Sequence, residues 1–381
     1  MFELMDVDTQ DAVIKVIGVG GCGGNAVDHM ITSGLSGVEF IAINTDAQAL
    51  NRNQAKLQLQ LGNGVTKGLG AGANPDIGRE AALEDRERIA ELIDGADMLF
   101  ITAGMGGGTG TGAAPVVAEV AKELGILTVA VVTKPFMFEG KRVRAANAGI
   151  EQLARHVDSL IIIPNEKLMQ VLGEDVSMLD AFKAANNVLH GAVGGIAEVI
   201  NCPGLVNVDF ADVRTVMSEM GMAMMGSAQA SGDNRARIAA EQAVASPLLE
   251  DVNLAGARGV LVNITASSTV KMREIHEVMN TIKGFTAEEA TVIVGQVLDD
   301  SMEGALRVTM VATGLGSPVA RQQPKTMQII RTGTDDGPIM MGNSEEVPSV
   351  MTNRRNRTVQ AMSDSGIDTL DIPAFLRRQA D

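Results

Sequence analysis

Short apolar runs with many branched side chains alternate with helical patterns along the first half of the chain. The apolar runs cover residues 13–19, 38–43, 98–103, 126–133 and 160–163, and apolar residues at helical spacing cover residues 79–93 and 113–124. The runs are continuous rather than alternating, which indicates strands buried on both faces of a parallel sheet. The pattern predicts a doubly wound, mostly parallel α/β domain over residues 1–176.

A long helical pattern follows this domain. Apolar residues recur at helical spacing from Met178 to Ile200, after a Ser177-x-x-Asp180 pair that is typical of a helix start. A Pro-Gly pair at residues 203–204 ends the pattern. These signals predict a connecting helix of about 24 residues, roughly 36 Å long, within residues 177–203.

Residues 204–316 have a different order of elements. Two helical segments precede an apolar run at residues 259–265, a helix follows, and further apolar runs cover residues 290–297 and 306–313. This order predicts a smaller α+β domain on a mixed or antiparallel sheet.

The last part of the chain changes composition again. Residues 317–366 are rich in Pro, Gly, Ser, Asn, Gln and Thr without periodicity, as in a flexible linker. Within residues 367–381, Ile372, Phe375 and Leu376 stand at helical spacing beside two arginines. This cluster is either a frayed terminus or a short docking peptide. We favour docking, because exposed apolar residues on a tether promote aggregation unless a partner covers them.

Composition argues against several classes of protein. The 381 residues are 45% hydrophobic with a net charge of −16, which disfavours nucleic acid because its phosphates would be repelled. The two cysteines, Cys22 and Cys202, are too few for a disulfide framework or a zinc site, so we expect no protein-held metal and a reducing, cytoplasmic environment. Every apolar stretch is short, so we expect neither secretion nor insertion into a membrane.

The most informative motif directly follows the apolar run at residues 98–103. It is made only of Gly and Thr: Gly106, Gly107, Gly108, Thr109, Gly110, Thr111 and Gly112. Glycine lets consecutive N–H groups face one anion, threonine adds hydroxyl donors, and the helix that follows offers its positive end. The motif predicts a phosphate-binding turn, because a flexible linker seldom stands between a buried strand and an apolar helix.

Two further glycine-rich turns accompany this motif. Gly18-x-Gly20-x-x-Gly23 matches the dinucleotide fingerprint, with Glu39 near the expected distance, and residues 68–75 form the other turn. A nicotinamide enzyme needs one such turn, whereas three suit a polyphosphate better. The chain has no Gly-x-x-x-x-Gly-Lys-Ser/Thr segment. We therefore expect a triphosphate held largely by backbone and hydroxyls, with Mg²⁺ neutralising its charge.

Residues 106–112 resemble the signature of the tubulin/FtsZ family of GTPases, and the resemblance extends over nearly all of residues 11–316. Further matches are residues 44–50 (NTDAQAL), 134–136 (KPF), 207–213 (NVDFADV) and 371–378 (DIPAFLRR). The resemblance implies that the chain binds GTP or GDP together with Mg²⁺.

The resemblance also implies which residues hold the nucleotide. The phosphates would lie against the three turns, formed by Gly20, Gly21, Cys22, Gly23, Gly24 and Asn25, by Ala71, Gly72 and Ala73, and by Gly106 to Gly112. Around the sugar and its phosphates the implied residues are Thr133, Glu139, Arg142 and Asn165. Phe182 would pack against guanine, and Asn186, one turn further along the same helix face, would contact its edge. Plain helix packing is the alternative for both.

Asp209 and Asp212 have two interpretations. A helical pattern begins at Val213, so Asp209 suits an N-cap with Asp212 supporting the first turn. The resemblance instead implies that Asn207, Asp209 and Asp212 form a catalytic loop that one subunit inserts over the nucleotide of the next, where the carboxylates orient water. Both interpretations can hold together. Hydrolysis would then require head-to-tail polymerisation, and such contacts generate filaments.

Three positions depart from the family pattern. Cys22 stands where glycine is more usual, which alters the first turn or makes it sensitive to oxidation. The basic segment is one residue short, so Arg144 is an alternative to Arg142. Asn186 stands where some members have Asp, so guanine specificity follows from the family more than from this residue.

The resemblance implies a cytoplasmic GTPase that forms protofilaments, assembles a ring at the mid-cell division site and recruits partners through residues 371–378. Those partners would be protein tethers, the actin-like FtsA and in some lineages ZipA, because two adjacent arginines and three apolar anchors are too few for lasting membrane adsorption. Two alternatives are a Rossmann oxidoreductase that uses NAD, and a filament regulator that binds nucleotide without assembling.

Overall fold

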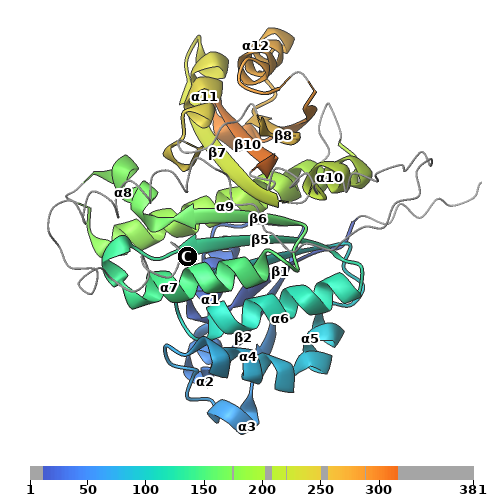
Figure 1. Cartoon of the computed structure of the whole chain (residues 1–381). Coiled ribbons are helices and arrows are strands. Elements are labelled where there is room, and N and C mark those ends of the chain that lie inside the picture. The colour runs from blue at the N-terminus through green and yellow to red at the C-terminus, as the bar shows by residue number, and fades with distance from the viewer. Residues whose placement is uncertain are drawn as a thin grey trace, which may run out of the picture. The chain divides into compact units, whose positions relative to one another are not determined.

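A computed structural model describes residues 12–173, 176–201, 208–219, 221–249, 256–287 and 289–315 (Figure 1). Within these residues one sheet of ten strands has the order β3-β2-β1-β4-β5-β6-β7-β10-β8-β9. The strands are β1 (Ile14–Val19), β2 (Glu39–Asn44), β3 (Leu57–Gln60), β4 (Met98–Gly104), β5 (Leu127–Lys134), β6 (Ser159–Pro164), β7 (Gly221–Ser231), β8 (Gly259–Ala266), β9 (Thr291–Leu298) and β10 (Ala305–Leu315).

Helices connect most of these strands. They are α1 (Gly20–Thr32), α2 (Ala47–Arg52), α3 (Asn63–Thr66), α4 (Pro75–Glu84), α5 (Arg86–Ile93), α6 (Thr109–Glu123), α7 (Lys141–Leu153), α8 (Asn165–Leu172), α9 (Met178–Asn201), α10 (Phe210–Met217), α11 (Arg235–Val244) and α12 (Met272–Lys283). Among the described residues no helix is long and apolar enough to cross a membrane.

The strands from β1 to β6 are parallel to one another, and β1, β4 and β5 in the middle of the sheet are buried on both faces. Ile14 and Val16 of β1 belong to a core shared with α1 and α9, whereas Ile17 and Val19 belong to a second core shared with α4, α5 and α6. Successive side chains of a strand face opposite sides, which explains the continuous apolar runs. The predicted doubly wound α/β arrangement is confirmed.

The remaining strands form a mixed portion of the same sheet. β10 is antiparallel to β7 and β8, and β8 is parallel to β9. β7 joins β6 through only three residue pairs. A separate core lies between these strands and α11 and α12. In Figure 1, α9 lies between the parallel strands and β7, β8 and β10, and it has contacts with β5, β8, β9 and β10.

Two expectations about local structure were wrong. The helical pattern at residues 79–93 is two helices, α4 and α5, which meet at Asp85. The Asp85 carboxylate accepts a hydrogen bond of 2.7 Å from the N–H of Gly62, which anchors the break. β7 was missed because Gly221–Ser231 contains no β-branched or aromatic side chain. The predicted connecting helix corresponds to α9, Met178–Asn201. The predicted linker and docking peptide lie outside the described residues.

Candidate functional site

Two glycine-rich turns lie side by side because the strands before them are neighbours. β1 pairs with β4 from Ile14 opposite Met98 to Val19 opposite Ala103, so both strands end at the same edge of the sheet. Gly20 follows β1 with φ +74°, and a Cβ there would lie 2.9 Å from the N atom of Gly110. The close approach needs glycine, and it brings the two turns into one surface.

The third glycine-rich turn joins this surface. A Cβ on Gly108 would lie 2.4 Å from the carbonyl oxygen of Gly72, so the two backbones are in contact. The hydroxyls of Thr45 and Thr109 lie 2.6 Å apart, and the Thr45 carbonyl accepts a hydrogen bond from the N–H of Gly70 at 3.1 Å. All three predicted turns therefore converge at one place.

Two of the helices that begin at this surface, α1 and α6, start without a side-chain cap from the described part of the chain, as do α3, α5, α7, α8 and α11. No side chain among the described residues caps α1, which begins at Gly20, or α6, which begins at Thr109, and neither has an acidic residue in its first turn. In contrast, Asp46, Asn74 and Asp209 cap α2, α4 and α10 through their side chains. Uncapped N–H groups at two adjacent helix starts form a site suited to an anion.

A cleft of about 450 Å³ opens beside the first two turns. It brings together eight of the residues singled out in the sequence: Cys22, Asn25, Thr133, Glu139, Arg142, Asn165, Phe182 and Asn186. These residues come from α1, β5, the short 3-10 helix Met137–Glu139, the start of α7, the start of α8 and the first half of α9. The volume lies within the range of pockets for small ligands.

Asn165 supplies a polar group that points to a ligand. Its side chain is 7% exposed, and its Oδ1 atom is buried without a hydrogen-bond partner among the described residues. A buried acceptor without a donor is costly, and a ligand hydroxyl or N–H in the cleft would supply one.

Arg142 supplies positive charge to the same cleft. Its guanidinium forms an ion pair with Glu139, and its Nε donates to the carbonyl of Gly106 at 3.4 Å. Glu139 also accepts a hydrogen bond of 3.0 Å from the N–H of Phe136. Arg142 thus connects the second glycine turn with the cleft. The alternative, Arg144, is not among the residues that line the cleft.

Phe182 and Asn186 stand one helical turn apart near the start of α9. Phe182 is 46% exposed and packs edge-on against Phe136, with ring centroids 6.4 Å apart. A half-exposed aromatic ring at a cleft offers a flat surface to a planar ligand group. Both side chains line the cleft, where they are accessible to a bound ligand.

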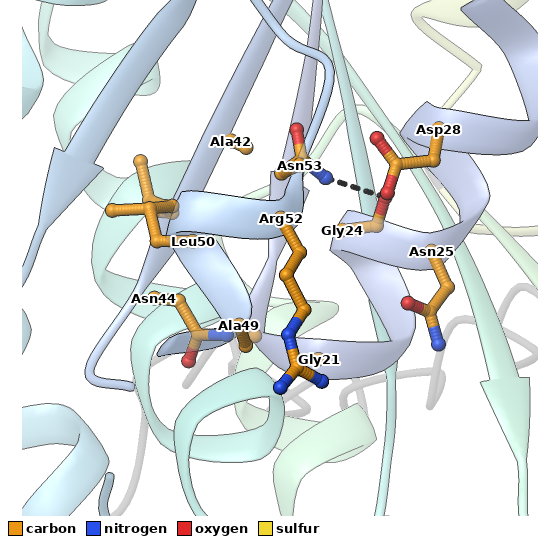
Figure 2. Close-up of a pocket in the computed structure, with 12 residues that line it drawn as sticks. Gly21, Gly24, Asn25, Asp28, Ala42, Asn44, Ala49, Leu50, Arg52 and Asn53 are labelled. Carbon is orange, nitrogen blue, oxygen red and sulfur yellow. Dashed lines mark hydrogen bonds between the residues drawn. The ribbon is translucent and has the colours of Figure 1, made fainter. Parts of the chain in front are cut away.

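A smaller cavity of about 160 Å³ lies on the other side of the first turn, between α1 and α2. Figure 2 shows Arg52 extended from the end of α2 toward Gly21, with Asn53 bonded to the carbonyl of Gly24 at 2.9 Å. Arg52 has no ion pair with any carboxylate in the described part of the chain. Arg52 was not among the residues predicted from the sequence, although it follows the family-like segment at residues 44–50 by two positions.

The predicted catalytic acids lie elsewhere. Asp209 caps α10 by accepting a hydrogen bond of 2.8 Å from the N–H of Asp212, so the N-cap interpretation is confirmed. Neither carboxylate lines the cleft, and α10 packs against β8 and β9. Phe182 and Asn186 of the cleft stand in the first half of α9, and α10 follows the other end of that helix along the chain (Figure 1). The two ends of α9 are about 35 Å apart at 1.5 Å per residue. Asn207 lies outside the described residues.

The turns and the cleft define an α/β protein that binds a nucleoside polyphosphate. Comparison with known proteins identifies the family. Residues 13–173 match the model of the tubulin/FtsZ family, GTPase domain, and residues 221–316 match that of the FtsZ family, C-terminal domain.

Individual relatives match along their whole length. "Cell division protein FtsZ" of Coxiella burnetii is 58% identical over 383 residues, with 99% of each chain covered. The protein of the same name from Pseudomonas aeruginosa is 58% identical over 394 residues, with 100% of each covered. A solved structure described as "FtsZ dimer, empty (M. jannaschii)" shares 45% identity and a TM-score of 0.77 over 80% of this chain and 89% of its own.

The chain therefore belongs to the tubulin/FtsZ family of GTPases. Guanine nucleotide binding and GTP hydrolysis follow from its GTPase domain. This membership decides against the alternative of an NAD-dependent oxidoreductase.

Proposed function

We propose that the chain is a cell-division GTPase that polymerises head to tail and hydrolyses GTP between subunits. The observation that carries this proposal is the separation of Asp209 and Asp212 from the cleft of their own chain. Acids at one end of α9 and a nucleotide cleft at the other suit a site shared by consecutive copies. The Coxiella burnetii relative is called a cell division protein, and the solved structure from M. jannaschii is described as an FtsZ dimer, which supports the proposal.

Each predicted site residue has a role in this proposal. The three glycine turns, including Gly20 to Asn25, Ala71 to Ala73 and Gly106 to Gly112, hold the phosphates through backbone N–H groups. Thr133, Glu139, Arg142 and Asn165 hold the ribose and its neighbouring phosphate, while Phe182 and Asn186 contact guanine. Asn207, Asp209 and Asp212 of the next copy orient the attacking water, so GTP supports the contact and GDP weakens it.

Mg²⁺ belongs to the proposal as a companion of the nucleotide. Within the described residues no group of three or more His, Cys, Asp or Glu side chains is arranged to hold a metal. The turns supply N–H and hydroxyl donors, which can bind phosphate oxygens. These donors are neutral, so they do not balance the negative charge of the phosphates. Mg²⁺ bound mainly to phosphates and water would neutralise that charge.

We also assign a role to each segment of the chain. Residues 1–176 bind nucleotide, residues 177–203 connect, and residues 204–316 present the catalytic acids. Residues 317–366 act as a linker, and residues 371–378 dock to tethers such as FtsA or ZipA at a cytoplasmic mid-cell ring. Deleting residues 367–381 should abolish binding to the tether and leave GTP turnover intact. Unchanged tether affinity after the deletion would refute this assignment.

A mixing experiment tests the shared site most directly. Asp212→Ala keeps the nucleotide cleft but lacks the acid, whereas Gly108→Ala keeps the acid but has a disturbed phosphate turn. Each alone should hydrolyse GTP slowly. An equal mixture should hydrolyse faster than either, because about a quarter of head-to-tail interfaces combine an intact cleft with an intact acid.

Controls make the result specific. Asp233→Ala changes an exposed acid in the turn after β7 and should retain full turnover. Turnover per subunit of the unaltered chain should rise above a threshold concentration together with GTP-dependent pelleting. If Asp212→Ala retained full turnover, or if turnover per subunit were constant from high dilution upward, the active site would be self-contained and the proposal would fail.

A further inference from the structure

Cys22 places a thiol inside the nucleotide cleft. It stands in the first turn of α1, is open to solvent, and lines the cleft with Thr133, Arg142 and Asn165. Its Sγ lies 3.7 Å from the hydroxyl of Thr133. The second cysteine of the chain, Cys202, lies outside the described residues.

Protein atoms surround the Cys22 side chain on two sides, and the space that remains accessible to it is the cleft. A Cβ built on Gly104 would lie 2.5 Å from Cys22 Cβ and 2.8 Å from its Sγ, so the backbone at the end of β4 closes one side. The Thr133 hydroxyl at the end of β5 closes another. Any group attached to the sulfur must therefore extend into the cleft.

A second observation points to a ligand in this space. Asn165 lines the same cleft and is only 7% exposed, and its Oδ1 atom is buried without a hydrogen-bond partner among the described residues. The cavity of about 450 Å³ is large enough for an adduct on Cys22, which would occupy the same space as a nucleotide that reaches Asn165.

We propose that Cys22 is a site of covalent modification by soft electrophiles such as maleimides and other activated alkenes, and that the adduct and the nucleotide exclude each other. The inference rests on the nucleotide cleft of the proposed function. In the reaction the sulfur attacks one alkene carbon, an S–C bond forms and the π bond breaks. The thiol proton leaves to solvent and the neighbouring carbon takes up a proton. The thiol adds across the double bond, and nothing is oxidised or reduced.

The test uses the full chain with Cys202→Ser, so that Cys22 is its one thiol. N-ethylmaleimide is added with no nucleotide, with GDP or with ATP, and the adduct is followed by mass spectrometry of the intact protein and its peptides. With GDP at one hundred times its Kd, labelling should slow about 100-fold, because only the open fraction reacts. ATP at the same concentration should protect far less. The labelled chain should lose binding of a fluorescent guanine nucleotide.

A thiol at the far end of the same helix, away from the cleft, serves as the control. Ser33→Cys, in a chain with Cys22→Ala and Cys202→Ser, puts an exposed thiol just after the far end of α1. The rate of its labelling should be the same with and without GDP. Nucleotide binding by each labelled chain is compared with that of the same chain before labelling. Labelling of Ser33→Cys should leave nucleotide binding as it was before treatment.

The outcomes separate this inference from the proposed function. Nucleotide binding is first measured on the unlabelled chain. If that chain binds GDP but Cys22 reacts equally fast with and without it, or if the labelled chain still binds nucleotide, the inference is overturned and the proposed function stands. Failure to label Cys22 in the folded chain, while urea-unfolded chain is labelled, also overturns it. If the unlabelled chain bound no guanine nucleotide, the proposed function would fail first.

Discussion

The hydroxyl of Thr45 lies 2.6 Å from the hydroxyl of Thr109, and both side chains are buried. Thr45 follows β2, whereas Thr109 begins α6, so the bond joins two segments that are 64 positions apart. The Thr45 carbonyl also accepts hydrogen bonds from the N–H of Gly70 and the hydroxyl of Thr66. Thr45 therefore fixes the third glycine turn against the second.

We expect Thr45→Val to loosen this arrangement. Valine has nearly the same shape but leaves the Thr109 hydroxyl buried without its partner, which should cost about 1–3 kcal/mol of stability. Denaturant unfolding and GDP binding would measure the effect, and both should weaken. Thr215→Val removes an exposed hydroxyl on α10 that bonds only to a carbonyl of its own helix, and its stability should change by less than about 0.5 kcal/mol. Equal losses in both variants would contradict the argument.

Gly108→Ala should weaken nucleotide binding by about ten- to hundredfold, the equivalent of about 1–3 kcal/mol of overpacking. The new Cβ would lie 2.4 Å from the Gly72 carbonyl oxygen, so the third turn must move away. The backbone of Gly108, with φ −80° and ψ −69°, accepts alanine, which leaves the collision as the cause. Isothermal titration with GDP measures the change.

Gly107→Ala is the matched variant for stability. A Cβ on Gly107 meets no atom of the described residues within 4 Å. Thermal unfolding without nucleotide should therefore be unchanged for Gly107→Ala and lowered for Gly108→Ala. A similar loss in both would show that chain flexibility, rather than the contact with Gly72, decides the stability of this region.

The parallel part of the fold could be predicted because strands buried on both faces, such as β1 and β4, carry continuous apolar residues. β7 could not be predicted, because Gly221–Ser231 contains no β-branched or aromatic side chain, and its place in the sheet depends on pairing with the distant β10. The break between α4 and α5 depends on the distant Gly62 N–H. The helical pattern of residues 79–93 gives no indication of this contact, so the break could not be predicted from the sequence.

The same distinction applies to the site. Glycine-rich turns can be recognised from the local sequence, because few other structural roles require so many residues without side chains. Their convergence depends on β1 pairing with β4 and on the contact between Gly108 and Gly72, which only the folded chain displays. Arg52 was missed for a related reason, since an arginine at the end of a short helix has no pattern that distinguishes it.

Asp209→Asn should separate the two roles of Asp209. Asparagine caps helices about as well as aspartate, so α10 should keep its stability, whereas an amide does not replace a carboxylate that orients water. We expect turnover at saturating GTP to fall at least about tenfold while thermal unfolding stays unchanged. Asp209→Ala should lower both, with about 1 kcal/mol lost from the missing cap. Full turnover in Asp209→Asn would leave the N-cap as the sole role.

Arg235 and Glu274 form a buried bidentate ion pair between α11 and α12, with Nε–Oε1 at 2.7 Å and Nη2–Oε2 at 3.0 Å. Their side chains are 8% and 9% exposed. Glu274→Gln should therefore destabilise the fold by about 3 kcal/mol at pH 7, because it leaves the arginine buried without its counter-charge. Glu241→Gln breaks the exposed pair with Arg237 and should cost less than about 0.5 kcal/mol.

The same pair gives the fold a pH dependence. Hydrogen bonds from Arg235 hold the pKa of Glu274 below its ordinary value of 4.5. The stabilisation is therefore fully present above pH 4.5 and is lost as the pH falls through the lowered pKa of the folded state. Denaturant unfolding between pH 7 and pH 3 should show a steeper loss for the unaltered chain than for Glu274→Gln. Parallel curves would contradict this assignment.

The labelling of Cys22 should depend on pH differently from that of an ordinary thiol. Cys22 has an exposed face, but the protein atoms packed around its sulfur displace water and raise the pKa of Cys22 above its usual value. The hydrogen bond with Thr133 and the charge of Arg142, which Glu139 partly balances, oppose this rise. Because the thiolate is the reactive form, the rate with N-ethylmaleimide should rise about tenfold per pH unit and show no plateau by pH 9. The exposed thiol of Ser33→Cys should level off near pH 8.5–9, about where a free cysteine titrates. A plateau for Cys22 below that of the control would mean that Arg142 outweighs burial, and the thiol would then be an activated one.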